Sequence, residues 1–346
     1  MKRVFLGASK LEVSELCLGT MLFNKFNQMD SNKQLDFALD SGINFLDTAE
    51  MYPVNPISKD TIGVSEEIIG DWMYQGNKRD QVIIATKIAG EGNKDIRNGE
   101  PISSRSIKRT IEASLRRLKT DYIDLYQLHW PNRGSYMFRK NWSFDPSSQK
   151  KLDTVSHIED TLGELKRQVD VGNVRYFGLS NESAWGTSMW LRIAEGLDLP
   201  KVLTIQNEYS LLCRLFDTDL AELCVNEDVT LLGFSPLAAG YLTGKYQNRI
   251  IPKGSRMFKN NQMGGRASSR VLPSTQAYLD IAKKYHLDPI HMSLAWYKYR
   301  PFKAIPIIGA TNLGQLNCIV NGVGVSLEKE VLQDINDTHK AYPMPY

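Results

Sequence analysis

Short apolar runs and longer amphipathic stretches alternate along the chain. The apolar runs are nearly continuous in aliphatic and aromatic residues, and this pattern is typical of parallel strands that are buried on both faces. The predicted strands span residues 16–20, 43–48, 81–87, 122–129, 174–180, 202–207, 229–235 and 304–310.

The stretches between these runs carry apolar residues at helical spacing. In residues 103–121 the apolar residues recur every three or four positions, at Ile107, Ile111, Leu115 and Leu118. Such a stripe predicts a helix that packs on one face, and the serines that open the segment suit an N-cap. Helical patterns continue the alternation in residues 31–42, 154–172, 218–228 and 275–286.

The alternation predicts a parallel sheet with helices outside it, and eight strands are the number that closes a (β/α)₈ TIM barrel. An open, doubly wound sheet usually carries a GxGxxG motif after its first strand. Here the first strand continues as LCLGTMLFNKF, without that motif, so we expect the barrel. No domain linker is recognisable, and residues 1–346 are interpreted as a single barrel domain.

Three further segments belong to this expected architecture. Before the first barrel strand, RVFLGASKLEVS predicts an N-terminal β-hairpin that turns at residues 7–9 and closes the bottom of the barrel. Long loops are expected at residues 131–152 and 240–272, and both follow strands, so both should lie over the C-terminal mouth. The first loop mixes basic and aromatic residues, a mixture also found in nucleic-acid-binding segments. A lid over a pocket is favoured, because the rest of the chain is not basic.

Composition excludes several classes of protein. Of the 346 residues, 42% are hydrophobic and 23% charged, and the net charge of +3 is too small to indicate nucleic acid or an anionic membrane as a partner. No apolar run approaches the ~20 residues of a membrane span, and the apolar run at the N-terminus is too short for the hydrophobic region of a signal sequence. The cysteines form no CxxC pair and no zinc-like cluster with histidine. We therefore expect a soluble cytoplasmic protein that holds no metal.

Ionisable residues close three consecutive predicted strands, at Asp47, Lys87 and His129, and Tyr52 follows shortly after the first. Each alone has an ordinary structural interpretation: a helix cap, a side chain reaching solvent, a core histidine and a packed loop tyrosine. Because neighbouring strands lie ~4.8 Å apart and polar strand ends converge at a barrel mouth, we expect the four side chains to meet.

Such a cluster has a definite chemistry. A phenol has an ordinary pKa of about 10, and a buried ammonium nearby favours the phenolate. Asp47 can supply the counter-charge for Lys87, and a neutral His129 can position a carbonyl oxygen. The cluster is thus a proton-donating site, and general acid catalysis contributes ~10²–10⁴-fold. Since no good nucleophile is present, hydride from a nicotinamide is the natural partner reagent.

At these residues the chain resembles the aldo-keto reductases, and within them the Tas-like branch. The matching stretches cover nearly the whole length: GINFLDTAEMYP, IIATK, DYIDLYQLHWP, GNVRYFGLSN, IQNEYSLL, GFSPLAAGYLTGKY and PIIGATNLGQL. The resemblance implies a barrel that binds NADPH without a Rossmann fold and reduces aldehydes and ketones. The resemblance implies that Tyr52 is the proton donor and that His129 positions the carbonyl. It also implies that Lys87, which is held by Asp47, lowers the pKa of Tyr52.

The same resemblance implies a set of cofactor contacts. Ser180, Asn181 and Gln206 would bind the nicotinamide carboxamide, and Phe234 would stack under the ring. The remaining implied contacts run along the pyrophosphate and the adenosine end: Ser235, Leu237, Gly240, Lys245, Arg256, Gly309, Thr311 and Gln315. An arginine at the 2′-phosphate would favour NADPH over NADH by charge pairing. Relatives often continue the last motif as QLxEN, whereas this chain has QLNCI, so we expect altered adenine contacts at Cys318 and Ile319.

The sequence indicates the substrate and the biological role less precisely than the fold and the catalytic residues. Trp130 and Met51 are expected to line the substrate pocket. An aromatic and apolar lining suggests aromatic or other apolar aldehydes as the small-molecule carbonyl substrate. The same fold also serves as potassium-channel β subunits, and the SPLAAG stretch of this chain is similar to theirs. Such a regulatory subunit would hold NADPH with slow or no turnover. No sequence pattern indicates an oligomeric state.

Overall fold

A computed structural model describes residues 1–54 and 56–346. Its centre is a closed barrel of eight parallel strands in the order β10-β3-β4-β5-β6-β7-β8-β9. The strands are β3 (Cys17–Gly19), β4 (Phe45–Asp47), β5 (Ile83–Ile88), β6 (Ile123–Leu128), β7 (Val174–Ser180), β8 (Val202–Glu208), β9 (Thr230–Phe234) and β10 (Ala304–Ile308). Since β10 pairs with both β9 and β3, the sheet has no open edge. The TIM barrel expected from the sequence is confirmed.

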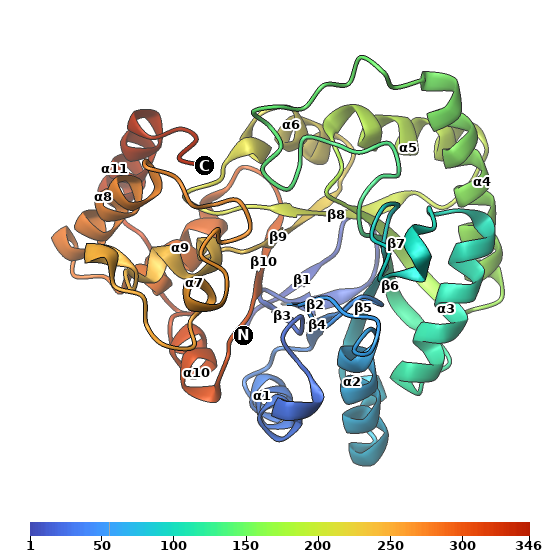
Figure 1. Ribbon diagram of the computed structural model, residues 1–346, viewed down its shortest axis with the longest axis horizontal. Coiled ribbons are helices and arrows are strands. Elements are labelled where there is room, and N and C mark those ends of the chain that lie inside the picture. The colour runs from blue at the N-terminus through green and yellow to red at the C-terminus, as the bar shows by residue number, and fades with distance from the viewer. Residues whose placement is uncertain (55) are drawn as a thin grey trace.

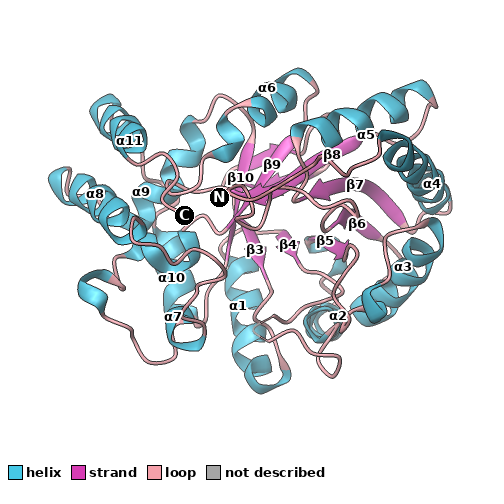
Figure 2. Cartoon of the chain, turned by 45° about the horizontal axis from the view of Figure 1, so that its top comes forward, coloured by secondary structure: helices cyan, strands magenta, loops and turns pink. Residues whose placement is uncertain are grey.

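Helices surround the strands on the outside (Figure 2). They are α1 (Gln28–Asp40), α2 (Val64–Gly76), α3 (Ser104–Leu118), α4 (Lys151–Asp170), α5 (Ala184–Gly196), α6 (Asp219–Asn226), α7 (Arg256–Lys259), α8 (Val271–Lys284), α9 (Pro289–Ala295), α10 (Leu313–Asn321) and α11 (Lys329–Ala341). Short 3₁₀ turns lie at Lys25–Asn27, Arg79–Gln81, Arg97–Gly99, Leu215–Asp217, Ala238–Thr243, Gln247–Arg249 and Trp296–Tyr299. None of the helices in the described ranges is long and apolar enough to cross a membrane.

An N-terminal hairpin closes the bottom of the barrel, as the sequence predicts. Strands β1 (Arg3–Phe5) and β2 (Glu12–Ser14) pair antiparallel. Their connecting residues bury Leu6 and Leu11 against the inward-facing side chains of the barrel strands, in a core cluster separate from the one under the helices. The backbone N–H of Gly7 donates to the Thr230 hydroxyl at 2.8 Å. Gly7 has φ +48°, and a Cβ there would lie 2.6 Å from the Asp228 carbonyl, so only glycine fits this approach.

The two long loops lie at the opposite end, after β6 and β9 (Figure 1). A single buried carboxylate fastens both of them, because Glu208 at the end of β8 accepts from Arg139 at 2.5 Å and from Arg266 at 2.7 Å. The hydroxyl of Tyr346 donates to the same carboxylate at 3.2 Å. The predicted position of both loops over the C-terminal mouth is therefore confirmed.

Candidate active site

The ends of three neighbouring strands bring the ionisable residues together. The Lys87 ammonium on β5 donates to the Asp47 carboxylate on β4 at 2.7 Å and to the Thr48 carbonyl at 2.7 Å. The same nitrogen lies 3.4 Å from the Tyr52 hydroxyl oxygen. Lys87 is completely buried, and Asp47, Tyr52 and His129 are each at most 8% exposed. The four residues form one cluster that is almost closed to water.

A tight loop after β4 returns Tyr52 to this cluster. The Tyr52 N–H donates to the Ala49 carbonyl at 3.1 Å, and the Tyr52 carbonyl accepts from the N–H groups of Gly63 at 3.0 Å and Ser65 at 3.4 Å. The phenol ring meets the His129 ring edge-on, with 5.8 Å between the ring centres. Backbone hydrogen bonds on both sides of Tyr52 therefore fix the position of its hydroxyl.

Burial and ion pairing shift the pKa values of Lys87 and Tyr52 in opposite directions. Burial disfavours the charged form of Lys87, but Asp47 and then Tyr52 outweigh it and raise the pKa of the ammonium above its ordinary value. For Tyr52, burial raises the pKa of the phenol, and the opposing effect of Lys87 is smaller. Lys87 thus acts in the direction that the sequence predicts, yet the phenol keeps its proton in this state of the protein.

His129 is neutral at physiological pH. Burial, and then the charge of Lys87, hold the pKa of its imidazole well below the ordinary value. Its backbone is fixed by an N–H bond to the Ile88 carbonyl at 2.9 Å and by the Asn181 amide, which donates to the His129 carbonyl at 3.0 Å. The ring nitrogen Nδ1 is buried and has no hydrogen-bond partner among the described residues. A neutral ring with free hydrogen-bonding capacity suits the positioning of a carbonyl oxygen.

Two glutamines hold the far oxygen of Asp47, and the sequence interpretation missed one of them. Nε2 of Gln206 on β8 donates to Oδ1 of Asp47 at 2.8 Å, and Nε2 of Gln127 on β6 donates to the same oxygen at 3.1 Å. Gln127 is completely buried. It lies two residues before His129 on a strand, so period-two alternation places both side chains on the inner face, and this signal was available in the sequence.

The predicted substrate walls lie beside the cluster. Met51 and Tyr52 belong to a small apolar cluster at the mouth, and Trp130 packs against it. The Trp130 ring centre lies 5.1 Å from that of His129, and its indole N–H donates to the Glu91 carbonyl at 3.1 Å. Trp130 therefore has a fixed orientation next to the proposed carbonyl position.

Ser180 and Asn181, at the end of β7, lie next to His129. The Ser180 hydroxyl donates to the Gln206 carbonyl at 2.8 Å, and the Ser135 hydroxyl donates to the Asn181 carbonyl at 2.7 Å. Oδ1 of Asn181 is buried without a hydrogen-bond partner in the described ranges. An acceptor oxygen of this kind can bind the N–H group of a ligand amide.

Comparison with known proteins decides the family. A sequence model described as "Aldo/keto reductase family" matches residues 15–340. Protein tas of Escherichia coli is 40% identical over 344 residues, which cover 97% of each chain. The chain belongs to the aldo/keto reductase family. Members of this family are oxidoreductases that act on small carbonyl compounds with a nicotinamide nucleotide, NADH or NADPH.

Two other aldo/keto reductase relatives carry different names. The uncharacterized oxidoreductase YrpG of Bacillus subtilis is 31% identical over 345 residues, 97% of this chain and 95% of that protein. A probable voltage-gated potassium channel subunit beta of Arabidopsis thaliana is 30% identical over 329 residues, 92% of this chain and 90% of that protein. The similarity to both enzyme-like and channel-associated relatives extends over nearly the full chain.

The segment after β9 makes sharp turns. Phe234 ends the strand half-buried, and the next residue, Ser235, accepts a hydrogen bond from Nη2 of Arg266 at 3.2 Å. The Gly240 N–H donates to the Leu237 carbonyl at 2.9 Å. Gly240 has φ +98°, and a Cβ there would lie 2.8 Å from the Lys245 side chain, so Lys245 crosses directly over this glycine.

Arg256 lies near two other arginines, Arg139 and Arg266. Its Nε is buried without a hydrogen-bond partner in the described chain, and burial, then Arg266 and Arg139, lower the pKa of its guanidinium. Thr311 donates two hydrogen bonds to the Gln315 side chain, at 3.0 and 3.1 Å, at the exposed start of α10 near the exposed Gly309. Within residues 1–54 and 56–346, no hydrogen bond joins Arg256 to either. The sequence missed Arg139 and Arg266 as its neighbours.

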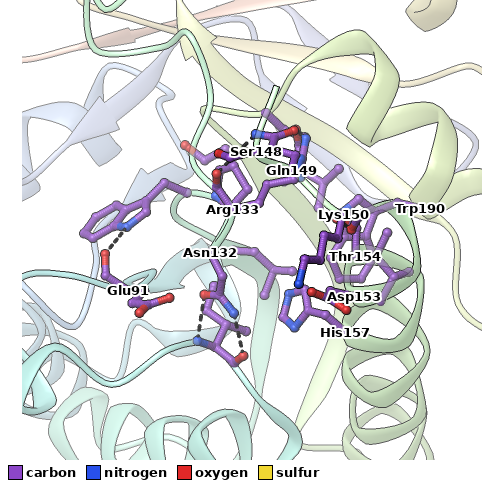
Figure 3. Close-up of a pocket in the computed structure, with 18 residues that line it drawn as sticks. Glu91, Asn132, Arg133, Ser148, Gln149, Lys150, Asp153, Thr154, His157 and Trp190 are labelled. Atoms are coloured by element: carbon purple, nitrogen blue, oxygen red, sulfur yellow. Dashed lines mark hydrogen bonds and ion pairs between the residues drawn. The ribbon is translucent and has the colours of Figure 1, made fainter. Parts of the chain in front are cut away.

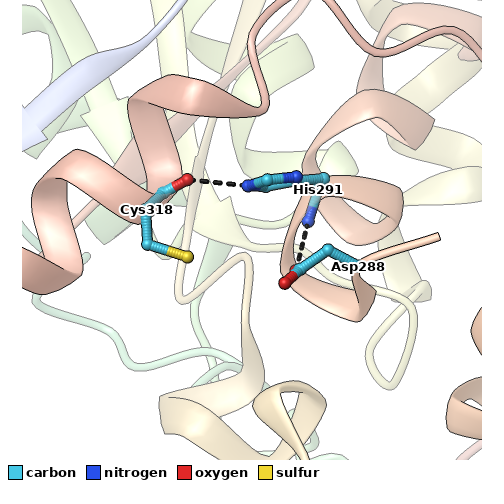
Figure 4. Close-up of side chains that lie close together, drawn as sticks. All are labelled: Asp288, His291 and Cys318. Atoms are coloured by element: carbon cyan, nitrogen blue, oxygen red, sulfur yellow. Dashed lines mark hydrogen bonds between the residues drawn. The ribbon is translucent and has the colours of Figure 1, made fainter.

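Cys318 on α10 faces Asp288 and His291 at the start of α9 (Figure 4). One ligand-capable atom from each lies within 4.8 Å of the others. These groups already have partners, because the Asp288 carboxylate caps α9 by accepting from Ile290 N–H at 2.7 Å, and His291 Nε2 bonds the Cys318 carbonyl at 2.7 Å. Burial, and then Asp288, raise the pKa of the Cys318 thiol. Ile319, by contrast, is buried in the core under the helices.

Proposed function

We propose that this protein uses NADPH to reduce aldehydes and ketones to alcohols, with Tyr52 as the general acid. The observation that carries the proposal is the position of the Lys87 ammonium, 3.4 Å from the Tyr52 hydroxyl and 2.7 Å from the Asp47 carboxylate, in a site almost closed to water. A phenol beside a buried ammonium can release a proton to an acceptor that becomes basic during the reaction.

The proposed chemistry assigns one task to each residue. When bound, the reduced nicotinamide supplies the hydride for the carbonyl carbon. The carbonyl oxygen lies between the Tyr52 hydroxyl and the neutral imidazole of His129, and it accepts the phenolic proton as negative charge develops on it. Lys87 stabilises the phenolate that remains, and Asp47 keeps Lys87 protonated. Preorganised groups of this kind lower the barrier because they need no rearrangement during the reaction.

Two unsatisfied buried atoms fit a nicotinamide nucleotide. Asn181 Oδ1 lies beside His129 and suits a carboxamide N–H, and Arg256 Nε suits a phosphate. We assign the carboxamide to Ser180, Asn181 and Gln206. The other proposed contacts are Phe234 under the ring, then Ser235, Leu237, Gly240 and Lys245 along the pyrophosphate, with Gly309, Thr311 and Gln315 at the adenosine. Arg256 at the 2′-phosphate would make the cofactor NADPH in preference to NADH.

The proposal also covers the class of substrate and the cellular compartment. Trp130 and Met51 give the pocket an aromatic and apolar wall, so we propose aromatic or other apolar aldehydes as substrates. We further propose that residues 1–346 act as one barrel domain in the cytoplasm. The four cysteines are free in the structure, which fits a reducing compartment.

The test is steady-state oxidation of NADPH by the purified protein with 4-nitrobenzaldehyde, with NADH in a parallel assay. We expect steady consumption of NADPH, well above that of NADH. Absence of turnover with NADPH across several aromatic and aliphatic carbonyls would overturn the reductase proposal.

A second candidate function comes from a different class. The similarity to a probable voltage-gated potassium channel subunit beta favours a cofactor-binding regulatory protein as the alternative. Such a protein retains the whole cluster around Tyr52 but turns over slowly or not at all. Tight binding of NADPH without oxidation of the cofactor by any carbonyl would support this candidate.

A further inference from the structure

A cavity of about 370 Å³ lies outside the barrel, under the loop that follows β6 (Figure 3). We call it the loop cavity. Its floor includes Leu128 and Leu179, which belong to the core cluster between strands and helices and not to the barrel interior. Its sides come from α4, through His157 and Ile158, and from α5, through Trp190. Sites for small molecules in proteins have volumes of about 300–1,000 Å³.

Hydrogen bonds hold the roof of the loop cavity in place. Asn132 accepts from the Ile102 N–H at 2.9 Å and donates to the Ile102 carbonyl at 2.9 Å. The Gln149 amide donates to the Arg133 carbonyl at 3.2 Å, which joins the two ends of the loop. Because the loop is fixed by polar contacts and not by side chains that fill the space below it, the cavity is formed in advance of any ligand.

The charges around the loop cavity favour a neutral occupant. The guanidinium of Arg133 forms a two-pronged ion pair with the buried Glu182 carboxylate, with one N–O distance of 2.9 Å. Lys150 and Asp153 are exposed at the rim and have opposite charges. The other charged side chains that line the loop cavity, Glu91, Lys150 and Asp153, are exposed to water, so none of them is a buried counter-charge. Burying an ionic ligand here would therefore cost more than burying a neutral one.

His157 offers hydrogen bonds that the protein does not use. Its ring meets the Trp190 ring edge-on with 6.0 Å between centres, and burial lowers the pKa of the imidazole. Neither ring nitrogen has a hydrogen-bond partner within residues 1–54 and 56–346. A neutral imidazole has one donor and one acceptor, so it suits a hydroxyl or carbonyl oxygen.

The walls of the loop cavity suit a flat ring. Two indoles, Trp130 and Trp190, line it together with aliphatic side chains. Aromatic rings pack favourably on indoles in stacked or edge-on arrangements. Trp130 also contacts His129, so a ligand in the loop cavity would lie behind the wall of the candidate active site.

We propose that the loop cavity is a second ligand site, which binds a neutral aromatic molecule through one hydroxyl or carbonyl oxygen at His157. The lining of this site includes none of Asp47, Tyr52, Lys87 and His129, although it shares Trp130 and Ser180 with the candidate active site. Ligand binding there does not depend on the proposed reductase activity. The oxygen hydrogen bonds to the imidazole, and the aromatic ring packs against the neighbouring indole of Trp190.

The test uses 4-nitrobenzyl alcohol, because its nitro group quenches tryptophan fluorescence. It is titrated into protein saturated with NADPH, a combination in which the alcohol is not turned over. His157→Phe keeps the ring packed on Trp190 but loses the hydrogen bond, so we expect about fivefold weaker binding of the alcohol, in line with ~1 kcal/mol for a buried hydrogen bond. Lys151→Ala, on the exposed side of the same helix, serves as the matched control and should bind as the wild type does.

Two further measurements separate the loop cavity from the active site. Ile158→Trp fills the cavity and should abolish the saturable quenching, while an unchanged Kd for NADPH would show that the variant is folded. A crystal soaked with the alcohol should show it in the loop cavity, with its hydroxyl at His157. Unchanged quenching in both His157→Phe and Ile158→Trp, or alcohol bound only beside Tyr52 in the crystal, would overturn the proposal.

Discussion

The ammonium nitrogen of Lys87 lies 3.4 Å from the hydroxyl oxygen of Tyr52. Both side chains are buried, so solvent does not screen the positive charge from the phenol. The charge persists in this setting because the Asp47 carboxylate lies 2.7 Å from the same nitrogen. The contact between Lys87 and Tyr52 therefore depends on Asp47, which makes the three residues a unit that can be tested by substitution.

Replacing Asp47 alone should destabilise the protein more than replacing Asp47 and Lys87 together. Asp47→Asn leaves the buried Lys87 ammonium without a counter-charge, and we expect a loss of about 3–5 kcal/mol in the free energy of unfolding. The double variant Asp47→Asn with Lys87→Met should recover much of this stability but none of the NADPH oxidation. Urea unfolding measures the first effect. Equal stabilities of the single and double variants would contradict a buried ion pair.

Gln127 should support Asp47 without contacting the cofactor. Gln127→Leu removes one hydrogen bond to the buried Asp47 carboxylate and a second one, which Gln127 Oε1 accepts from Nε2 of Gln206 at 3.1 Å. We expect a loss of about 1.5–3 kcal/mol in unfolding free energy with slower turnover. Gln206→Leu removes a similar bond, but it should also weaken NADPH binding, because Gln206 is the proposed carboxamide contact. Titration of both variants with NADPH distinguishes the two roles. Because Gln127 also contacts Gln206, some change in the NADPH Kd of Gln127→Leu is expected, but a change as large as that of Gln206→Leu would contradict the separate roles.

His129 should make the protein less stable in mild acid. Its pKa is depressed by burial in the folded state, so below the ordinary pKa of about 6.5 the unfolded chain takes up a proton that the folded protein does not. This single group should lower the unfolding free energy by up to about 1.4 kcal/mol per pH unit. His129→Gln lacks the effect, whereas the other histidines are the same in both proteins. Parallel stability curves from pH 8 to pH 5 would mean that His129 is charged in the folded state.

Arg256 should set the preference between the two nicotinamide nucleotides. A charge-assisted hydrogen bond contributes about 1.5–3 kcal/mol, so we expect Arg256→Ala to weaken NADPH binding about ten- to a hundredfold. NADH lacks the 2′-phosphate, and its Kd should stay within about twofold. Fluorescence titration with both nucleotides measures the difference. Equal losses for NADPH and NADH would place Arg256 at another part of the cofactor site.

The strands were predictable, but several of the helices were not: no helix was predicted at α2, α5, α7, α9, α10 or α11. Buried parallel strands leave continuous apolar runs, and polar residues at their ends point to the mouth, so Asp47, Lys87 and His129 could be grouped from the sequence. Helices α2 and α5 each have a glycine in their interior, Gly70 and Gly186, and glycine lowers helix propensity. A Cβ at Gly70 would lie 2.1 Å from the Arg117 carbonyl, and one at Gly186 would lie 2.2 Å from Glu182, so close tertiary packing requires these glycines.

The arrangement of the arginines at the mouth was also beyond the sequence. Arg139 and Arg266 lie far apart in the chain, on two long loops without a regular hydrophobic pattern. They meet only because both loops fold over β8 onto Glu208. The loop cavity could not be predicted from the sequence either. Its roof depends on hydrogen bonds between Asn132 and Ile102, which leave no periodic pattern in the sequence.

The most direct test of the account compares wild-type protein with Tyr52→Phe, in NADPH binding and in oxidation of NADPH by 4-nitrobenzaldehyde. The substitution removes one oxygen and leaves the ring beside His129, so the Kd for NADPH should be unchanged. Turnover should fall by about 10²–10⁴-fold, the usual contribution of a general acid. Oxidation of NADPH by Tyr52→Phe at the wild-type rate would contradict the assignment of Tyr52 as the proton donor.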